Sequence, residues 1–144
     1  MMRVEVKGVR LERPEPTAPT EPVVLTPQDR TYVMLRSPEP SRTLDIQIGS
    51  AEAFAISSAL EGMRWDRPTT VELLGEVIAA LGATLRQVVI TEYREDGVYI
   101  AEIEVTNQDG NAARISARPS DAVALALRLD APILVNEALF ADAA

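Results

Sequence analysis

Two arginine–proline pairs in this chain each stand just before an expected helix that carries an acid in its first turn. Arg67-Pro68 precedes Glu72, and Arg118-Pro119 precedes Asp121. The first turn of a helix leaves backbone N–H groups without intrahelical partners, so helix starts attract anions. If both starts face one cleft, they offer two guanidinium groups to a phosphate and two carboxylates to a metal ion. This pattern suits a phosphodiester substrate.

The chemistry that this constellation favours is metal-dependent hydrolysis. Asp121 and Glu72 would hold a hard divalent cation, in the first instance Mg²⁺, and the ion would activate water. Arg118 or Arg67 would stabilise the charge that develops on the phosphate. The candidates for contacting the substrate at the two helix starts are Ser120 and Thr70.

A purely structural explanation fits the same residues, and the sequence leaves both open. First-turn acids stabilise the helix dipole, and neighbouring arginines form ion pairs that fix helix positions. Ser120 is a typical helix-start hydroxyl, because no histidine is present to activate it as a nucleophile. Glu52 and Glu61 are weaker candidates, on the solvated face of an earlier helix. Trp65 could stack on a base, or it could cover the core or anchor an interface.

Composition narrows the function further. The 144 residues include no Cys and no His, which excludes thiolate chemistry and zinc sites built from those ligands. The formal net charge of −8 argues against binding nucleic acid through a basic face, although a carboxylate-bound metal lets an acidic protein act on phosphates. Residues 1–9 contain no apolar run, and no segment is long enough to span a membrane. We therefore expect a cytoplasmic protein without a signal peptide or a membrane span.

The elements that must position these residues are short and alternate in type. The third strand of an antiparallel meander runs directly into the helix that starts at Arg118, and this helix has no polar side chain from Ala122 to Leu127, which predicts burial on all sides. Thr69 and Glu72 have capping-box spacing.

Residues 12–30 are expected to form an enlarged Pro-rich loop, with a possible short edge strand at 23–25. Strands are expected at 2–11, 32–36, 44–48, 84–92, 98–106, 112–117 and 133–135, and helices at 50–60, 70–81, 118–128 and 137–141. We therefore expect residues 1–144 to form a single α+β domain with a mixed, largely antiparallel sheet and packed helices.

Several of these motifs, in this order, resemble the bifunctional nuclease (DNase/RNase) domain family. They are Leu44-Asp45-Ile46-Gln47-Ile48-Gly49 followed by Glu52-Ala53, Arg67-Pro68 before Leu73-Leu74, the run from Ala117 to Arg128, and Ala131-Pro132-Ile133. The resemblance covers roughly 4–140. It implies a compact α+β domain and cleavage of DNA and RNA, as reported for some members.

The chain departs from the family pattern at three positions. Where the family usually has Thr-His-Asp-Leu-Leu, this chain has Thr70-Val71-Glu72-Leu73-Leu74, and Ser116 replaces a usual Asp. A mechanism that uses that His as base or that Asp as ligand cannot operate here. The alternative to a nuclease is therefore a weakened or inactive binding or regulatory module of the same fold. A homo-oligomer is a further prediction, based on the small residues of the 50–60 helix and on short edge strands.

Overall fold

The computed structural model describes residues 1–13, 29–38 and 40–142, with side chains up to Phe140. Apart from its two ends, the expected Pro-rich loop, including the possible edge strand at 23–25, lies outside these residues. The remaining expected elements are all present, in an α+β arrangement. They are β1 (Met2–Glu12), β2 (Arg30–Ser37), β3 (Arg42–Ile48), α1 (Ser50–Leu60), α2 (Thr70–Ala80), β4 (Thr84–Tyr93), β5 (Tyr99–Thr106), β6 (Ala112–Ala117), α3 (Pro119–Leu129), β7 (Ile133–Val135) and α4 (Ala138–Asp142).

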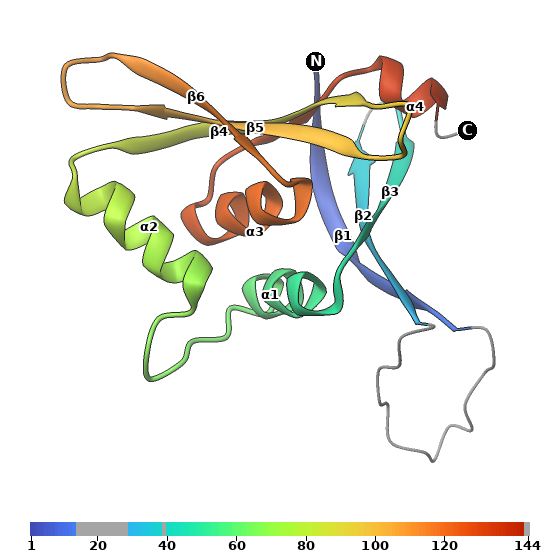
Figure 1. The fold of residues 1–144 in the computed structure, drawn as a ribbon, viewed down its shortest axis with the longest axis horizontal. Coiled ribbons are helices and arrows are strands. Elements are labelled where there is room, and N and C mark those ends of the chain that lie inside the picture. Colours follow the sequence, from blue (N-terminus) through green and yellow to red (C-terminus); the bar gives the residue numbers. More distant parts are fainter. Residues whose placement is uncertain (14–28, 39, 143–144) are drawn as a thin grey trace.

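The strands form one seven-stranded sheet in the order β3-β2-β1-β7-β4-β5-β6. Neighbouring strands are antiparallel except β4 and β7, which are parallel, so the sheet is mixed and largely antiparallel as expected. The short strand β7 joins the two halves, because it pairs with β1 on one side and β4 on the other. Figure 1 shows that β1, β2 and β3 turn sharply away from the direction of β4, β5 and β6.

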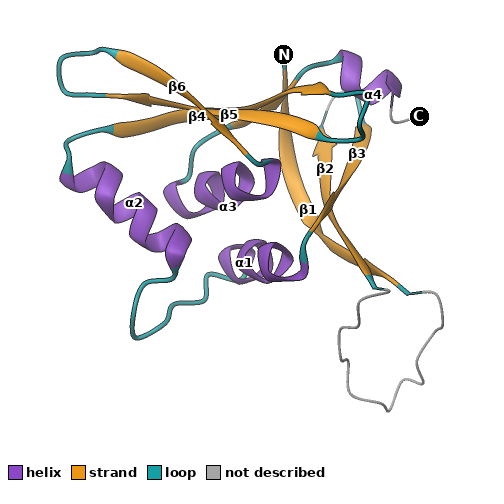
Figure 2. Ribbon diagram, in the orientation of Figure 1, coloured by secondary structure: helices purple, strands orange, loops and turns teal. Residues whose placement is uncertain are grey.

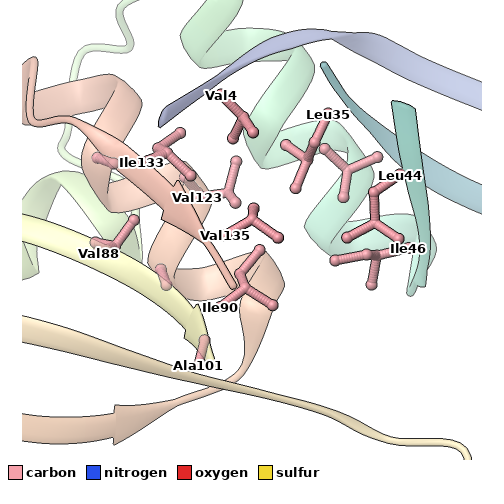
Figure 3. Close-up of a cluster of buried hydrophobic side chains, with 14 of the residues drawn as sticks. Val4, Leu35, Leu44, Ile46, Val88, Ile90, Ala101, Val123, Ile133 and Val135 are labelled. Carbon is pink, nitrogen blue, oxygen red and sulfur yellow. The ribbon is translucent and has the colours of Figure 1, made fainter. Parts of the chain in front are cut away.

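Helices α1, α2 and α3 gather on one side of this bent sheet, with α3 in contact with both of the others and with β4 and β5 (Figure 2). The predicted burial of α3 is confirmed, since Ala122 to Ala126 are all buried. Figure 3 shows the core around Val123 of α3, where Val4, Ile133 and Val88 come from three neighbouring strands in register. Because α3 is fixed in the core, the residues at its ends have well-defined positions.

The helix starts follow the sequence signals in part. Thr69 caps α2 as expected, since its side chain accepts a hydrogen bond from the Glu72 backbone N–H. Helix α1 is different, because its N-cap is Gly49 and not Ser50, and the cap makes no side-chain hydrogen bond. Both α1 and α2 are followed by a glycine with positive φ, Gly62 and Gly82, as expected of residues that end helices.

The faces that α1 and α2 bury differ from the apolar patterns of their sequences. In α1 the buried residues include Ala53 and Ile56, whereas Phe54 is exposed. In α2 only Gly75 is buried, because it allows a close approach of Leu129 from α3. The remaining large apolar side chains of α2 and its C-cap are mostly exposed: Leu73, Leu74, Val77 and Leu81. No helix among the described residues is long and apolar enough to cross a membrane.

Candidate active site

The starts of α1 and α3 meet at the guanidinium group of Arg118. This residue is the N-cap of α3, and Pro119 follows at the first helical position, where its missing N–H costs nothing. Arg118 donates from Nε to Asp121 Oδ2 at 2.8 Å and from Nη2 to Asp121 Oδ1 at 3.1 Å, which is a bidentate pair. Its third nitrogen, Nη1, donates to Glu52 Oε1 at 3.1 Å. One guanidinium therefore joins two carboxylates from two helices.

Solvent reaches this cluster, so its groups are available for chemistry. The side chain of Arg118 is 64% exposed, and those of Asp121 and Glu52 are 47% and 23% exposed. The hydrogen bonds that Arg118 donates to Asp121, and to a smaller degree the one it donates to Glu52, raise the pKa of Arg118 above its ordinary value. Arg118 thus stays positively charged at any working pH.

The Glu52 carboxylate is placed by the backbone of its own helix. A Cβ built on Gly49 would overlap the Glu52 carboxylate, so only a residue without a side chain leaves room for this position. Glu52 lies in the first turn of α1, where the positive end of the helix favours a negative charge. The same local physics places Asp121 in the first turn of α3.

A cavity of about 330 Å³ opens beside these groups. Arg118, Asp121, Ser120 and Thr70, four of the predicted site residues, lie in its wall. Val71, which stands where the family usually has His, lines the same cavity, so that position brings an isopropyl group to the site. Ser116, at the usual Asp position, is exposed on β6 and is not among the lining residues. The full lining is Ala51, Glu52, Phe54, Ala55, Ser58, Trp65, Thr69, Thr70, Val71, Arg118, Ser120, Asp121, Ala124 and Arg128.

Glu72 is held elsewhere. Its carboxylate lies 3.7 Å from Arg128 Nη2 and 3.9 Å from Arg64 Nη1, and it accepts a hydrogen bond of 3.2 Å from Thr69 Oγ1. The side chain is 10% exposed and does not line the cavity. The structure therefore does not place Glu72 in the cavity wall beside Asp121, and in this chain the Glu72 side chain pairs with arginines and with the Thr69 hydroxyl at the start of α2.

Arg67 also lies outside the cavity wall. It is exposed in the segment before α2, and within residues 1–13, 29–38 and 40–142 it makes no hydrogen bond or ion pair. The second arginine in the wall is Arg128, which sequence reasoning missed. Its Nη1 donates to the Met63 carbonyl at 2.8 Å, and it is nearly buried, so it ties α3 to the segment before α2.

Sequence reasoning also underestimated Glu52. Glu52 carries the same sequence signal as Asp121, namely an acid in the first turn of a helix. The sequence does not show which helix start faces α3, so this signal did not distinguish Glu52 from Glu72. Phe54 and Trp65 were not expected to meet, yet their ring centroids are 5.9 Å apart on the cavity wall. Residues far apart in sequence converge here because α1 and the segment 61–69 both pack beside α3.

Two carboxylates in the cavity wall, those of Glu52 and Asp121, are the acidic groups that could hold a cation there. Glu52 and Asp121 both reach one positive group, the guanidinium of Arg118, so their oxygens already converge on a place that favours positive charge. Mg²⁺ commonly takes one or two protein carboxylates and completes its shell with water and substrate phosphate. Over the described part of the chain, no three acidic residues come together as a metal-binding group.

The fold and this cavity define a small α+β domain with an acid-and-arginine site at two helix starts. The model of the bifunctional nuclease domain matches residues 33–144, and the chain belongs to that family. An uncharacterized protein of Mycobacterium tuberculosis (strain H37Rv) is 40% identical over 143 residues, which cover 99% of this chain and 76% of that protein.

Two rice proteins are more distant relatives. Bifunctional nuclease 1 of Oryza sativa subsp. japonica and the bifunctional nuclease of Oryza minuta are each 27% identical over 139 residues. The matched region covers 94% of this chain but 38% of either rice protein. These names describe the rice proteins, which are much longer than this chain.

Proposed function

We propose that this chain hydrolyses phosphodiester bonds of DNA or RNA at the cavity beside Arg118. The observation that supports this proposal is the sharing of one exposed guanidinium by Asp121 and Glu52 in a cavity wall. The family and the names of the rice relatives point to the same class of reaction.

The residues of the chain would divide the work. Arg118 is charged, exposed and fork-shaped, so it suits a phosphate oxygen and the charge that develops on it. Ser120 and Thr70 bring hydroxyl donors to the same wall. The chain has no histidine, and among the described residues that line the cavity Asp121 and Glu52 are the acids that could take a proton from water. A divalent cation such as Mg²⁺, held by these two carboxylates, would supply activated water and neutralise phosphate charge.

A second candidate is a module of the same fold that binds nucleic acid without cutting it. Two observations favour this candidate. Val71 brings an apolar side chain to the position where the family usually has His, and Arg118 stands between the two carboxylates that would hold the ion. In such a module, Asp121 and Glu52 would orient Arg118 toward a phosphate and do nothing more.

Cleavage of single-stranded DNA and RNA separates the two candidates. The chain should cleave with Mg²⁺ or Mn²⁺ and stop when a chelator is added, and Asp121→Asn should remove activity with an unchanged melting curve. Asp96→Asn is the matched control, because Asp96 pairs with Arg94 at 2.9 Å in the turn between β4 and β5, outside the cavity wall. Cleavage that resists the chelator, or an active Asp121→Asn variant, would refute the metal mechanism. If the chain cleaves neither substrate under any of these conditions, the result supports the module that binds nucleic acid without cutting it.

Self-association is proposed for the same chain on a separate observation. Leu73, Leu74 and Val77 leave an apolar strip of α2 open to solvent, and single-chain proteins seldom expose such strips without a partner. A second copy packed along α2 would cover it. Light scattering over a range of protein concentrations tests this, and a constant monomer mass would contradict it.

A further inference from the structure

Two aromatic side chains lie open to solvent in the wall of the cavity. Phe54, on α1, is 58% exposed, and Trp65, in the segment between α1 and α2, is 42% exposed. Their ring planes are tilted by 35°. The chain has only six aromatic residues, so placing two of them together at the surface leaves the core with fewer large side chains. Such exposure needs a reason other than folding, because aromatic rings gain most from burial.

Several arginines lie near this aromatic pair, beside acidic side chains of the same segment and of the same cavity wall. Arg64 and Arg67 flank Trp65 in sequence, and both are exposed. Arg64 has only a loose ion pair, with Glu72 at 3.9 Å, and Arg67 has no ion pair or hydrogen bond in the described part of the chain. Arg118 stands in the wall of the same cavity. Proteins commonly bind single-stranded nucleic acid with exposed aromatic side chains next to basic ones, because bases stack on the rings and phosphates contact the cations.

The cavity has the size and character of a ligand site. At about 330 Å³ it lies at the lower end of the range for small-molecule pockets, and side chains such as Ala55, Val71 and Ala124 make much of its wall apolar. A flat nucleobase suits such a wall. A base inside a duplex is paired and stacked on its neighbours, so it cannot enter without leaving the helix.

We propose that the cavity takes an unpaired nucleobase, stacked against Trp65 and Phe54, with a neighbouring phosphate at Arg118 and the flanking strand along Arg64 and Arg67. This inference rests on the proposed function, because it names the substrate class of the same site: single-stranded nucleic acid or an unpaired stretch. The cavity selects unpaired strands, and the base contact supplies affinity that an acidic protein cannot obtain from charge alone.

Trp65 is the only tryptophan in the chain, so its emission reports directly on the cavity. The titration is done in chelator, where binding is measured without cleavage. The probes are a short single-stranded oligonucleotide, the matched duplex, and a strand of equal length without bases. The single strand should quench Trp65, and the duplex and the base-free strand should bind far more weakly. Equal affinity for the base-free strand would overturn the proposal.

Variants test the two parts of the site separately. Phe54→Ala should weaken binding of the single strand by roughly five- to a hundredfold, which is the usual effect of losing one stacking ring. Leu81→Ala, which removes an exposed apolar side chain elsewhere, should leave binding unchanged. Arg67→Gln should flatten the dependence of log affinity on log salt by about 0.7, whereas Arg86→Gln, on exposed β4 surface, should not. Unchanged binding by Phe54→Ala, with its melting curve intact, would refute the stacking site.

Failure of this inference is distinguishable from failure of the proposed function. Metal-dependent cleavage that is equal for single strands and duplexes, and insensitive to Phe54→Ala, keeps the hydrolysis and removes the base site. Quenching by single strands without any cleavage keeps the base site and removes the hydrolysis. If Trp65 emission depends on protein concentration without nucleic acid, and Phe54→Ala abolishes that dependence, the aromatic pair is a contact between copies and the proposal is wrong.

Discussion

Gly49→Ala tests the site without removing any charged group. The added methyl would occupy the space where the Glu52 carboxylate now lies, so Glu52 must move away from Arg118. Gly49 has φ −72° and ψ 162°, which alanine adopts without strain. The substitution therefore acts on the position of Glu52 and not on the backbone.

The expected effect on stability is small. Alanine is a poorer N-cap than glycine by up to about 1 kcal/mol, whereas the lower entropy of the unfolded chain returns about 0.4–1 kcal/mol. The Glu52–Arg118 ion pair adds less than about 1 kcal/mol, because the Arg118 end is largely in solvent. These terms nearly cancel, so the free energy of unfolding should stay within about 1 kcal/mol of the parent.

The expected effect on function is larger. Glu52 is one of the two carboxylates proposed to hold the cation, so displacing it should lower kcat/KM by roughly ten- to a hundredfold, the usual effect of disturbing the groups around a bound metal. The assay is cleavage of a single-stranded oligonucleotide with Mg²⁺, next to urea unfolding of each variant. Glu52→Gln should give a similar loss, and the double variant should be no worse than the poorer single one, because both changes remove one interaction. Full activity in Gly49→Ala beside an inactive Glu52→Gln would refute the role of the glycine.

Four other outcomes are expected. Val123→Ala should cost about 2 kcal/mol or more in urea unfolding, because it removes two methyl groups from the centre of a packed core. Gly75→Ala should stabilise by up to about 1 kcal/mol in the same measurement, since Leu129 is at the surface and yields to a Cβ that approaches it at 3.0 Å. Val77→Glu should give a monomeric mass in light scattering if α2 forms the contact between copies. The difference in melting temperature between the parent and Arg118→Gln should be the same at about pH 6 and about pH 9. A raised arginine pKa contributes stability that is fully present below the pKa of the unfolded chain and is lost only as the pH rises through the pKa of the folded chain, which is above both test conditions.

Local patterns predicted the elements well because their causes are local. The apolar run from Ala122 to Ala126 is buried in α3 and Leu127 is half-buried, and the Thr69 cap begins α2 within one residue of the expected place. The strand at 133–135 was expected as well. Its position between β1 and β4 was not, because strand order depends on how α3 crosses the sheet and leaves no trace in the local sequence.

The exposed faces of α1 and α2 also could not be predicted from local sequence. Helical spacing groups Leu73, Val77 and Leu81 on one stripe, which favours burial of that stripe. In the structure α2 instead approaches α3 through Gly75, so the apolar stripe faces solvent. A pattern of side chains says which residues share a face, but the helix that a face meets is decided by backbone approach and by neighbours distant in sequence.

The three first-turn acids show how tertiary position divides one local signal into different roles. Each of Glu52, Glu72 and Asp121 lies in the first turn of a helix, where its negative charge is favourable. The sequence distinguishes them only by the motifs around them. Helix α3 separates them, because Arg118 and Arg128 are ten residues apart, about 15 Å along a helix axis at 1.5 Å per residue. Glu52 pairs with Arg118 and Glu72 with Arg128. The carboxylate that lies with Asp121 at Arg118 is therefore that of Glu52, whereas Glu72 is held by Arg128 and by the start of α2.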